Sequence, residues 1–210
     1  MIVEDTVPVD EEQDKKIVQA ISVAIQLVVG NTAVAQPPSL TKYTITFKQY
    51  VFCHIHKEFG LQWESGSEGS EIQHQATRVR YLLTGFNFLQ DPHHPETEFF
   101  SSSFFQNFMI DMLFLTPMSL WNCVLPNDQL DNVFGLGGAA LAVTLKDFIQ
   151  GYYCELLDCS AEKWQDDYLS ILSLISCMQA NPIRRDWLVM LQQSLMTQGH
   201  TGLPPSYTFV

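Results

Sequence analysis

The 210-residue sequence is short of charge, and of basic charge above all. Only 16% of its residues are charged, against about 25% in typical soluble domains, while 46% are hydrophobic. It has 11 Lys and Arg against 23 Asp and Glu, a formal net charge of −12. The hydrophobic content excludes a disordered chain. The shortage of basic residues argues against a surface that binds nucleic acid.

The sequence also lacks the usual signs of secretion and of membrane insertion. Five cysteines, an odd number at irregular spacing, do not form the dense, even set of a secreted disulfide framework. The acidic start, residues 1–5, has no basic region like that of a secretory signal. The uncharged apolar run 133–145 is too short for a membrane span. We expect an intracellular protein, in the cytoplasm or nucleus, that makes no membrane contact.

Apolar residues recur at helical spacing in six or seven segments. The predicted helices cover residues 17–29, 41–59, 71–83, 103–115, 139–150, a segment that starts after Ser160, and 182–198. In the second of these, apolar residues follow an i+4 series from Tyr43 to Phe59, although a short strand at 43–47 is the alternative because that run is β-prone. Helices with one apolar stripe must pack against each other. The sequence therefore predicts an all-α, single-domain bundle, with a short N-terminal hairpin or strand as the variant.

Glycines and charged residues suggest the boundaries of this domain. We place an acidic N-terminal arm at 1–10, the helical domain at 11–199, a Gly/Ser-rich loop at 64–70, and a C-terminal tail at 200–210. Six carboxylates within residues 4–14 run into the first predicted helix, where they complement its dipole. The group Gly135, Gly137 and Gly138 predicts a chain break before a helix that begins at Ala139.

The strongest local signal is Asn181-Pro182, an N-cap followed by proline at the first helical position. The spacing of the helix that follows predicts that Trp187, Met190, Leu191 and Leu195 face the core. Gly199 is expected to end this helix.

One cluster of residues has the chemistry of a metal site. Cys53 and His56 would share one helix face, His54 lies between them, and His93 and His94 would supply further ligands. Their spacing does not match the paired ligand doublets of zinc modules. We therefore interpret Cys53 as a core residue and the histidines as surface residues, and predict no metal.

The remaining candidates are also explained by ordinary structural roles. Cys154 and Cys159 are not spaced as a redox motif, and adjacent Asp166 and Asp167 point to different sides of a helix. The other residues weighed were Asp128 with Asp131, Glu96 with Glu98, the glycines 135–138 as an anion site before a helix, and Arg78, Arg80, Arg184 and Arg185. We expect the carboxylates to be solvated and the arginines to pair internally or face solvent. The sequence thus predicts no catalytic, cofactor-binding or metal-binding residue, and no cofactor.

The stretch from Leu136 to Gly151, followed by Trp164, Tyr168 and residues 184–195, resembles a helical domain of unknown function. That domain is widespread in mushroom-forming (basidiomycete) fungi and is often found near mobile elements. In it, an Ala-Leu-x-x-Thr-x-Leu helix ending in glycine precedes an aromatic-rich helix and a terminal helix. The resemblance covers residues 78–198 at most. It implies an all-α fold in a fungal protein, and no assigned activity.

Two functions follow as hypotheses. The first is a protein–protein interaction or assembly module without catalytic activity, whose partner is another protein or a second copy. It rests on the absence of catalytic motifs and on an aromatic content of 12%, since surplus aromatic residues can mark an interface. Seven of these residues gather between Phe99 and Trp121. The alternative is a metal-assisted hydrolase that uses Cys53, His56 and His93.

Overall fold

The computed structural model describes residues 40–61, 69–91, 98–115, 130–154 and 161–202. Within these ranges the chain forms six α-helices and no strand, which confirms the all-α prediction. The predicted arm at 1–10 and the predicted helix at 17–29 lie outside the described residues. The elements are α2 (Leu40–Phe59), α3 (Gly69–Leu83), the 3-10 helix η1 (Thr84–Leu89), α4 (Ser103–Ile110), the π-helical turn η2 (Asp111–Leu115), α5 (Asp131–Lys146), α6 (Ala161–Ala180) and α7 (Pro182–Gly202).

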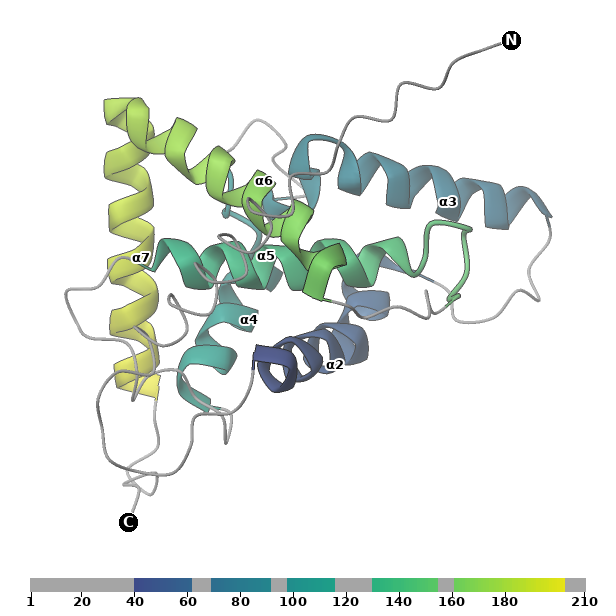
Figure 1. The fold of residues 1–210 in the computed structure, drawn as a ribbon, viewed down its shortest axis with the longest axis horizontal. Helices are drawn as coiled ribbons and strands as arrows, with labels where there is room; N and C mark the ends of the chain where they lie inside the picture. Colours follow the sequence, from purple (N-terminus) through teal and green to yellow (C-terminus); the bar gives the residue numbers. More distant parts are fainter. Residues whose placement is uncertain (1–39, 62–68, 92–97, 116–129, 155–160, 203–210) are drawn as a thin grey trace, which may run out of the picture.

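Helix α5 runs through the centre of the molecule (Figure 1). It packs against α6, α2, α3 and α4, while α7 packs on α6 and α4. Twelve of the sixteen α5 residues are buried. A helix that is apolar on nearly every side must be enclosed by its neighbours, and α5 therefore organises the bundle.

The glycines of α5 do not break the chain, so the prediction of a helix that begins only at Ala139 was wrong. Helix α5 passes through Gly135, Gly137 and Gly138. A Cβ atom at Gly137 would lie 2.6 Å from the Met109 sulfur, and one at Gly138 would lie 2.7 Å from Ile171. The close approach of α4 and α6 explains the glycines. The packing it allows outweighs the roughly 1 kcal/mol that each glycine costs inside a helix.

Helix α2 confirms the i+4 apolar series and excludes the strand at 43–47. Phe47, Val51, Ile55 and Phe59 are all buried. Gly60 ends the helix in the left-handed region, with φ of +60°. The core side of α2 is thus the one that the sequence predicted.

Helix α4 begins at Ser103, the predicted start, and Ser102 caps it. The Phe105 backbone N–H donates to Ser102 Oγ over 3.3 Å, and the helix continues as the π-turn η2. Phe105 also packs on Phe100 and Phe134, with ring centroids 5.2 and 5.4 Å away. The surplus of aromatic residues in this segment is therefore largely core, and of the seven residues only Trp121 lies outside the described part of the chain.

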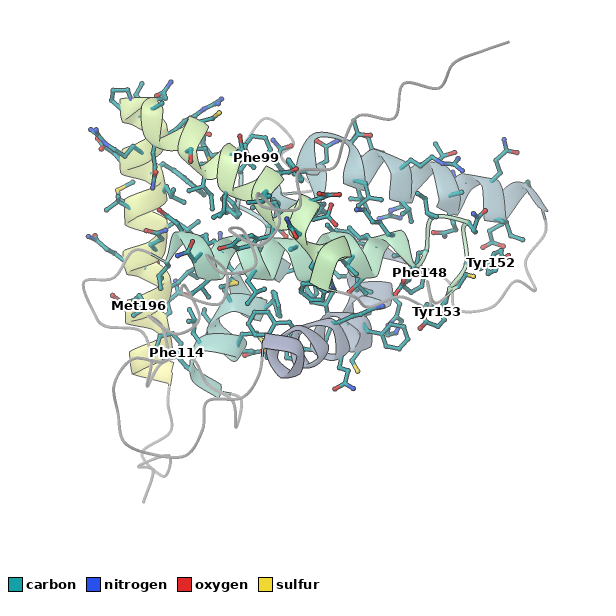
Figure 2. The ribbon with its side chains drawn as sticks, in the orientation of Figure 1. Phe99, Phe114, Phe148, Tyr152, Tyr153 and Met196 are labelled. Carbon is teal, nitrogen blue, oxygen red and sulfur yellow. The ribbon has the colours of Figure 1, made fainter. Side chains whose placement is uncertain are left out.

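The end of α5 differs from the prediction, because the helix stops at Lys146 rather than Gln150. The Cys154 N–H donates to the Asp147 carbonyl, and the buried Asp147 carboxylate pairs with Lys48 of α2 at 2.8 Å. These contacts hold the turn 147–154 against α2. Figure 2 shows the aromatic residues Phe148, Tyr152 and Tyr153 in this turn.

Two further predicted boundaries were wrong. Helix α3 begins at Gly69, inside the predicted loop 64–70. Helix α7 continues through Gly199 to Gly202, past the predicted end of the domain. Gly199 is buried against the Phe114 ring, which lies beside α7 near Met196 (Figure 2). It is a packing position rather than a helix terminator.

Tyr168 of α6 provides a test of this packing at alkaline pH. Its hydroxyl donates to Asn132 Oδ1 over 3.1 Å, and burial raises the pKa of Tyr168 to about 12. Because the folded pKa lies above the unfolded value near 10, this stabilisation is complete below pH 10 and is lost as the pH rises towards 12. Urea unfolding of wild type and Tyr168→Phe at pH 8 and 11 should show the wild type losing about 1 kcal/mol more. An equal loss in both would contradict this assignment.

Candidate functional site

The start of α7 has the capping geometry that the sequence predicts. Asn181 Oδ1 accepts hydrogen bonds from the Ile183 N–H at 3.0 Å and the Arg184 N–H at 3.3 Å. Pro182 occupies the first helical position, where its missing N–H leaves no bond unmade. The cap fixes where α7 begins.

Asn181→Ala should lower the free energy of unfolding by about 0.5–2 kcal/mol, because it leaves two N–H groups without their side-chain acceptor. Asn181→Asp is the matched control, since it keeps the acceptor and places a negative charge at the positive end of the helix dipole. Chemical denaturation measures both. A loss as large for the aspartate variant as for the alanine variant would show that the cap bond is not the cause.

The core side of α7 consists of Leu188, Leu191 and Leu195, all buried. The sequence analysis found the last two, but it missed Leu188 and wrongly placed Met190 inward. Met190 is 62% exposed. At 100° per residue, position 190 lies well away from the row 188, 191, 195, which the buried Gly199 continues.

A line of apolar side chains runs along the outer side of α7. Ile183 is 80% exposed, Met190 is 62% exposed, and Trp187 between them is half-buried at the edge of the core. The three residues are spaced i, i+4, i+7 and so share one side of the helix. We call them the α7 stripe.

The surface around the α7 stripe carries little charge. Between Tyr168 and Gly202, a segment of α6 and α7, the only residues of type Asp, Glu, Lys or Arg are Arg184, Arg185 and Asp186. This segment therefore has a net charge of +1 in a chain of −12. Large exposed apolar side chains in this segment also include Leu169 of α6 and Val189 of α7.

The arginines near the α7 stripe are exposed and form surface ion pairs. Arg184 Nε lies 3.2 Å from Glu98 Oε2, which ties the start of α7 to the segment before α4. Arg185 Nε lies 3.5 Å from Asp186. Pairs of this kind contribute little to stability. Arg78 and Arg80 of α3 are exposed, as expected.

The residues weighed as metal ligands do not form a metal site within the described part of the chain. His54 is exposed as expected, but Cys53 is exposed too, so its assignment to the core was wrong. Cys53 lies two residues past the buried Val51, off the i+4 row that faces the core. No group of three His, Cys, Asp or Glu suited to a metal occurs among the described residues. His93 and His94 lie outside them.

A polar contact that the sequence analysis missed joins α2 to η2. The Tyr50 hydroxyl donates to Asp111 Oδ2, and the His54 ring stacks on Tyr50 at 4.5 Å. Burial, the hydrogen bond to Asp111 and the charge of that carboxylate together raise the pKa of Tyr50 well above its usual value. The hydroxyl therefore keeps its proton and links the two elements. Nothing in the sequence spacing signals this pair, which is 61 residues apart.

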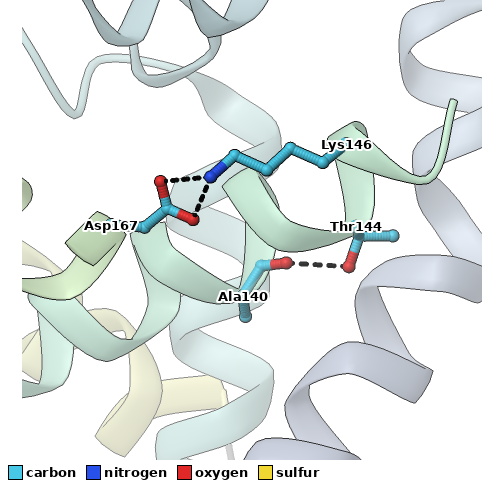
Figure 3. A network of polar contacts seen from close by, with 4 residues as sticks. All are labelled: Ala140, Thr144, Lys146 and Asp167. Atoms are coloured by element: carbon cyan, nitrogen blue, oxygen red, sulfur yellow. Dashed lines mark hydrogen bonds and ion pairs between the residues drawn. The ribbon is translucent and has the colours of Figure 1, made fainter. Parts of the chain in front are cut away.

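Among the described carboxylates, Asp167 and Asp131 are held by other side chains. Asp167 was expected in solvent, but Lys146 Nζ donates to both of its oxygens at 2.7 and 2.8 Å, which links α5 to α6 (Figure 3). Asp131 accepts from the side-chain amides of Gln179 and Gln192. Asp166 is exposed as predicted.

The structure describes the other candidates in whole or in part. Cys154 is exposed and free, whereas Cys159 lies outside the described residues, as do Asp128 and Glu96. The glycines 135–138 lie inside α5 rather than before it, so the idea of an anion site at a helix start was wrong there.

The described residues form an all-α fold in which α7 carries an exposed, charge-poor face. No protein-family model, curated protein or solved structure matches the chain. The resemblance to the fungal helical domain stays a prediction. Across the described ranges, every helix is too short or too polar to cross a bilayer.

Proposed function

We propose that this chain is a protein-interaction module without catalytic activity, and that it binds its partner through the α7 stripe. The observation that carries the proposal is the exposure of Ile183 and Met190, at 80% and 62%, on either side of Trp187. Exposing these side chains gives no stability to the fold, whereas burying them against a partner would remove apolar surface from water.

The composition of this surface supports the proposal. The central parts of protein interfaces are poor in charged residues and enriched in aromatic residues, Met and Arg. The α7 stripe supplies Trp187 and Met190. Such interfaces depend on a few anchors near their centre, and Trp is enriched among them. Trp187, which is half-buried at the edge of the core, occupies the position expected of such an anchor.

The test compares the double variant Ile183→Ser/Met190→Ser with wild type. Tyr81→Ser is the matched control, because Tyr81 is a large exposed side chain, at 56%, on the distant helix α3. Crosslinking in cells followed by quantitative mass spectrometry should recover partners with wild type and with the control. The double variant should lose them. The same partners at the same yield with all three proteins would refute the proposal.

The same variants decide whether the partner is a second copy of this chain. Light scattering of the purified protein would then give twice the monomer mass of 23.9 kDa, and only the double variant would be monomeric. A strict monomer in every variant would direct the search to a different protein.

Trp187→Ala separates binding from folding. Full burial of Trp187 would make the truncation cost about 3–5 kcal/mol. Because the side chain is only partly buried, we expect a smaller loss of stability and a large loss of binding. Calorimetric melting and partner capture on the same preparation measure both. A full 3–5 kcal/mol loss with intact binding of the folded fraction would make Trp187 a core residue only.

A further inference from the structure

We propose that the partner of the α7 stripe is an amphipathic helix of a different protein, with Lys or Arg beside its apolar row. The inference rests on the proposed function, because it takes the same stripe to be the binding surface. It goes further by naming the secondary structure and the sign of the charge that the partner presents.

The α7 stripe suits a helix better than an extended peptide. A partner that adds a strand needs the edge of a sheet, and the described residues form no strand. A proline-rich peptide needs a groove lined with aromatic residues, whereas Trp187 is the one aromatic residue of the stripe, between Ile183 and Met190. A helix instead packs its row of apolar side chains against a row with similar spacing. The stripe is such a row.

The charged side chain beside the stripe is negative. Asp186 lies three residues from Ile183 and four from Met190, so it is the neighbour of both on the helix surface. The Asp186 side chain is 72% exposed, and its contact with Arg185 Nε, at 3.5 Å, is a surface pair of the kind that contributes little to stability. Asp186 can therefore bind a Lys or Arg of the partner without losing a strong interaction within the chain.

The two arginines of α7 do not reverse the charge at the stripe. Arg184 Nε lies 3.2 Å from Glu98 Oε2, so its charge is compensated by that carboxylate. At 100° per residue, Arg185 lies on the side of α7 opposite Ile183 and Met190. An acidic or phosphorylated helix on the stripe would therefore meet a carboxylate, whereas a basic helix meets a charge of opposite sign.

The charge of the whole chain favours the same kind of partner. With 23 acidic and 11 basic residues, the chain has a net charge of −12. A field of this sign attracts a basic partner before contact and raises its rate of association. It opposes a second copy, which would bring a further −12 and the same Asp186 to the interface. A basic helix of a different protein fits both the apolar spacing of the stripe and its charge.

Two synthetic helical peptides of about five turns test the proposal against the full chain. Both carry the same leucine row, and one has lysines beside it where the other has glutamates. Fluorescence anisotropy of the labelled peptides measures their affinities. We expect wild type to bind the lysine peptide about tenfold more tightly than the glutamate peptide, which corresponds to about 1.4 kcal/mol. Ile183→Ser/Met190→Ser should bind neither peptide.

Asp186→Lys separates the contact at the stripe from the net charge of the chain. Glu58→Lys is the matched control, because Glu58 is exposed on α2 and its replacement makes the same change in net charge. Asp186→Lys should reduce the advantage of the lysine peptide from about tenfold to about twofold, since an exposed ion pair is replaced by a repulsion. Glu58→Lys should keep most of the advantage.

Equal affinities of the two peptides for wild type, or no binding of either, would overturn the inference. Equal effects of Asp186→Lys and Glu58→Lys would also overturn it, because the preference would then come from net charge alone. So would peptide binding that survives in Ile183→Ser/Met190→Ser. In each case the proposed function would still stand if the capture of cellular partners depended on Ile183 and Met190, and it would fall separately if it did not.

Discussion

Phe105→Ala is expected to lower the free energy of unfolding by about 3–5 kcal/mol, a large part of the about 5–15 kcal/mol that holds a typical domain together. The Phe105 ring is completely buried and contacts Phe100, Phe134 and Gly137. Truncation removes the apolar burial of the ring and leaves a cavity that the surrounding Phe100 and Phe134 side chains cannot fill. Urea denaturation followed by circular dichroism measures the loss.

Tyr81→Ala is the control for Phe105→Ala, since it also truncates an aromatic side chain on a helix but at an exposed position. Its effect should stay within about 0.5 kcal/mol. Similar losses in the two variants would mean that Phe105 is not at the centre of the core.

Gly151→Ala is expected to cost about 2–5 kcal/mol from two separate causes. Gly151 has φ of +89°, a conformation that costs residues with a Cβ about 1–2 kcal/mol. The added Cβ would also lie 2.1 Å from the backbone oxygen of Ile72 in α3. Backbone cannot rotate away as a side chain can, so α3 must shift from the turn after α5, at a further cost of about 1–3 kcal/mol.

Gly85→Ala isolates the conformational part of that cost. Gly85 has φ of +59°, and a Cβ there would meet no atom within 4 Å. Thermal melts of both variants should place Gly151→Ala clearly below Gly85→Ala. Equal melting temperatures would mean that the contact between Gly151 and Ile72 contributes nothing to stability.

Local signals were enough to predict much of the fold. The i+4 series through Val51 and Ile55 predicted the buried side of α2, and Asn181 predicted the start of α7. Each of these features depends on residues within a few positions of each other. Helical periodicity and side-chain caps can therefore be recognised in a single sequence.

Features set by distant residues were not predictable. Gly137 and Gly199 are residues of a type that usually breaks helices. They lie inside helices because Met109 packs against Gly137 and Phe114 packs against Gly199, and both partners are far away in the sequence. The exposure of the α7 stripe was missed for a similar reason. Met190 is apolar and at helical spacing, so it was assigned to the core, and its exposure depends on which side of α7 its neighbours α4 and α6 cover.

The composition of α5 also bears on the order in which the helices form. Three glycines, two valines and a threonine within its sixteen residues give it a poor intrinsic tendency to be helical. Its hydrogen-bonded turns are stabilised mainly by the helices around it, so α5 cannot persist as an early, isolated helix. Refolding should therefore be concerted at this point, with α5 becoming helical in the same barrier-crossing step that docks α4 and α6 onto it. The molecule would then have no long-lived intermediate in which its outer helices are assembled around an unfolded centre.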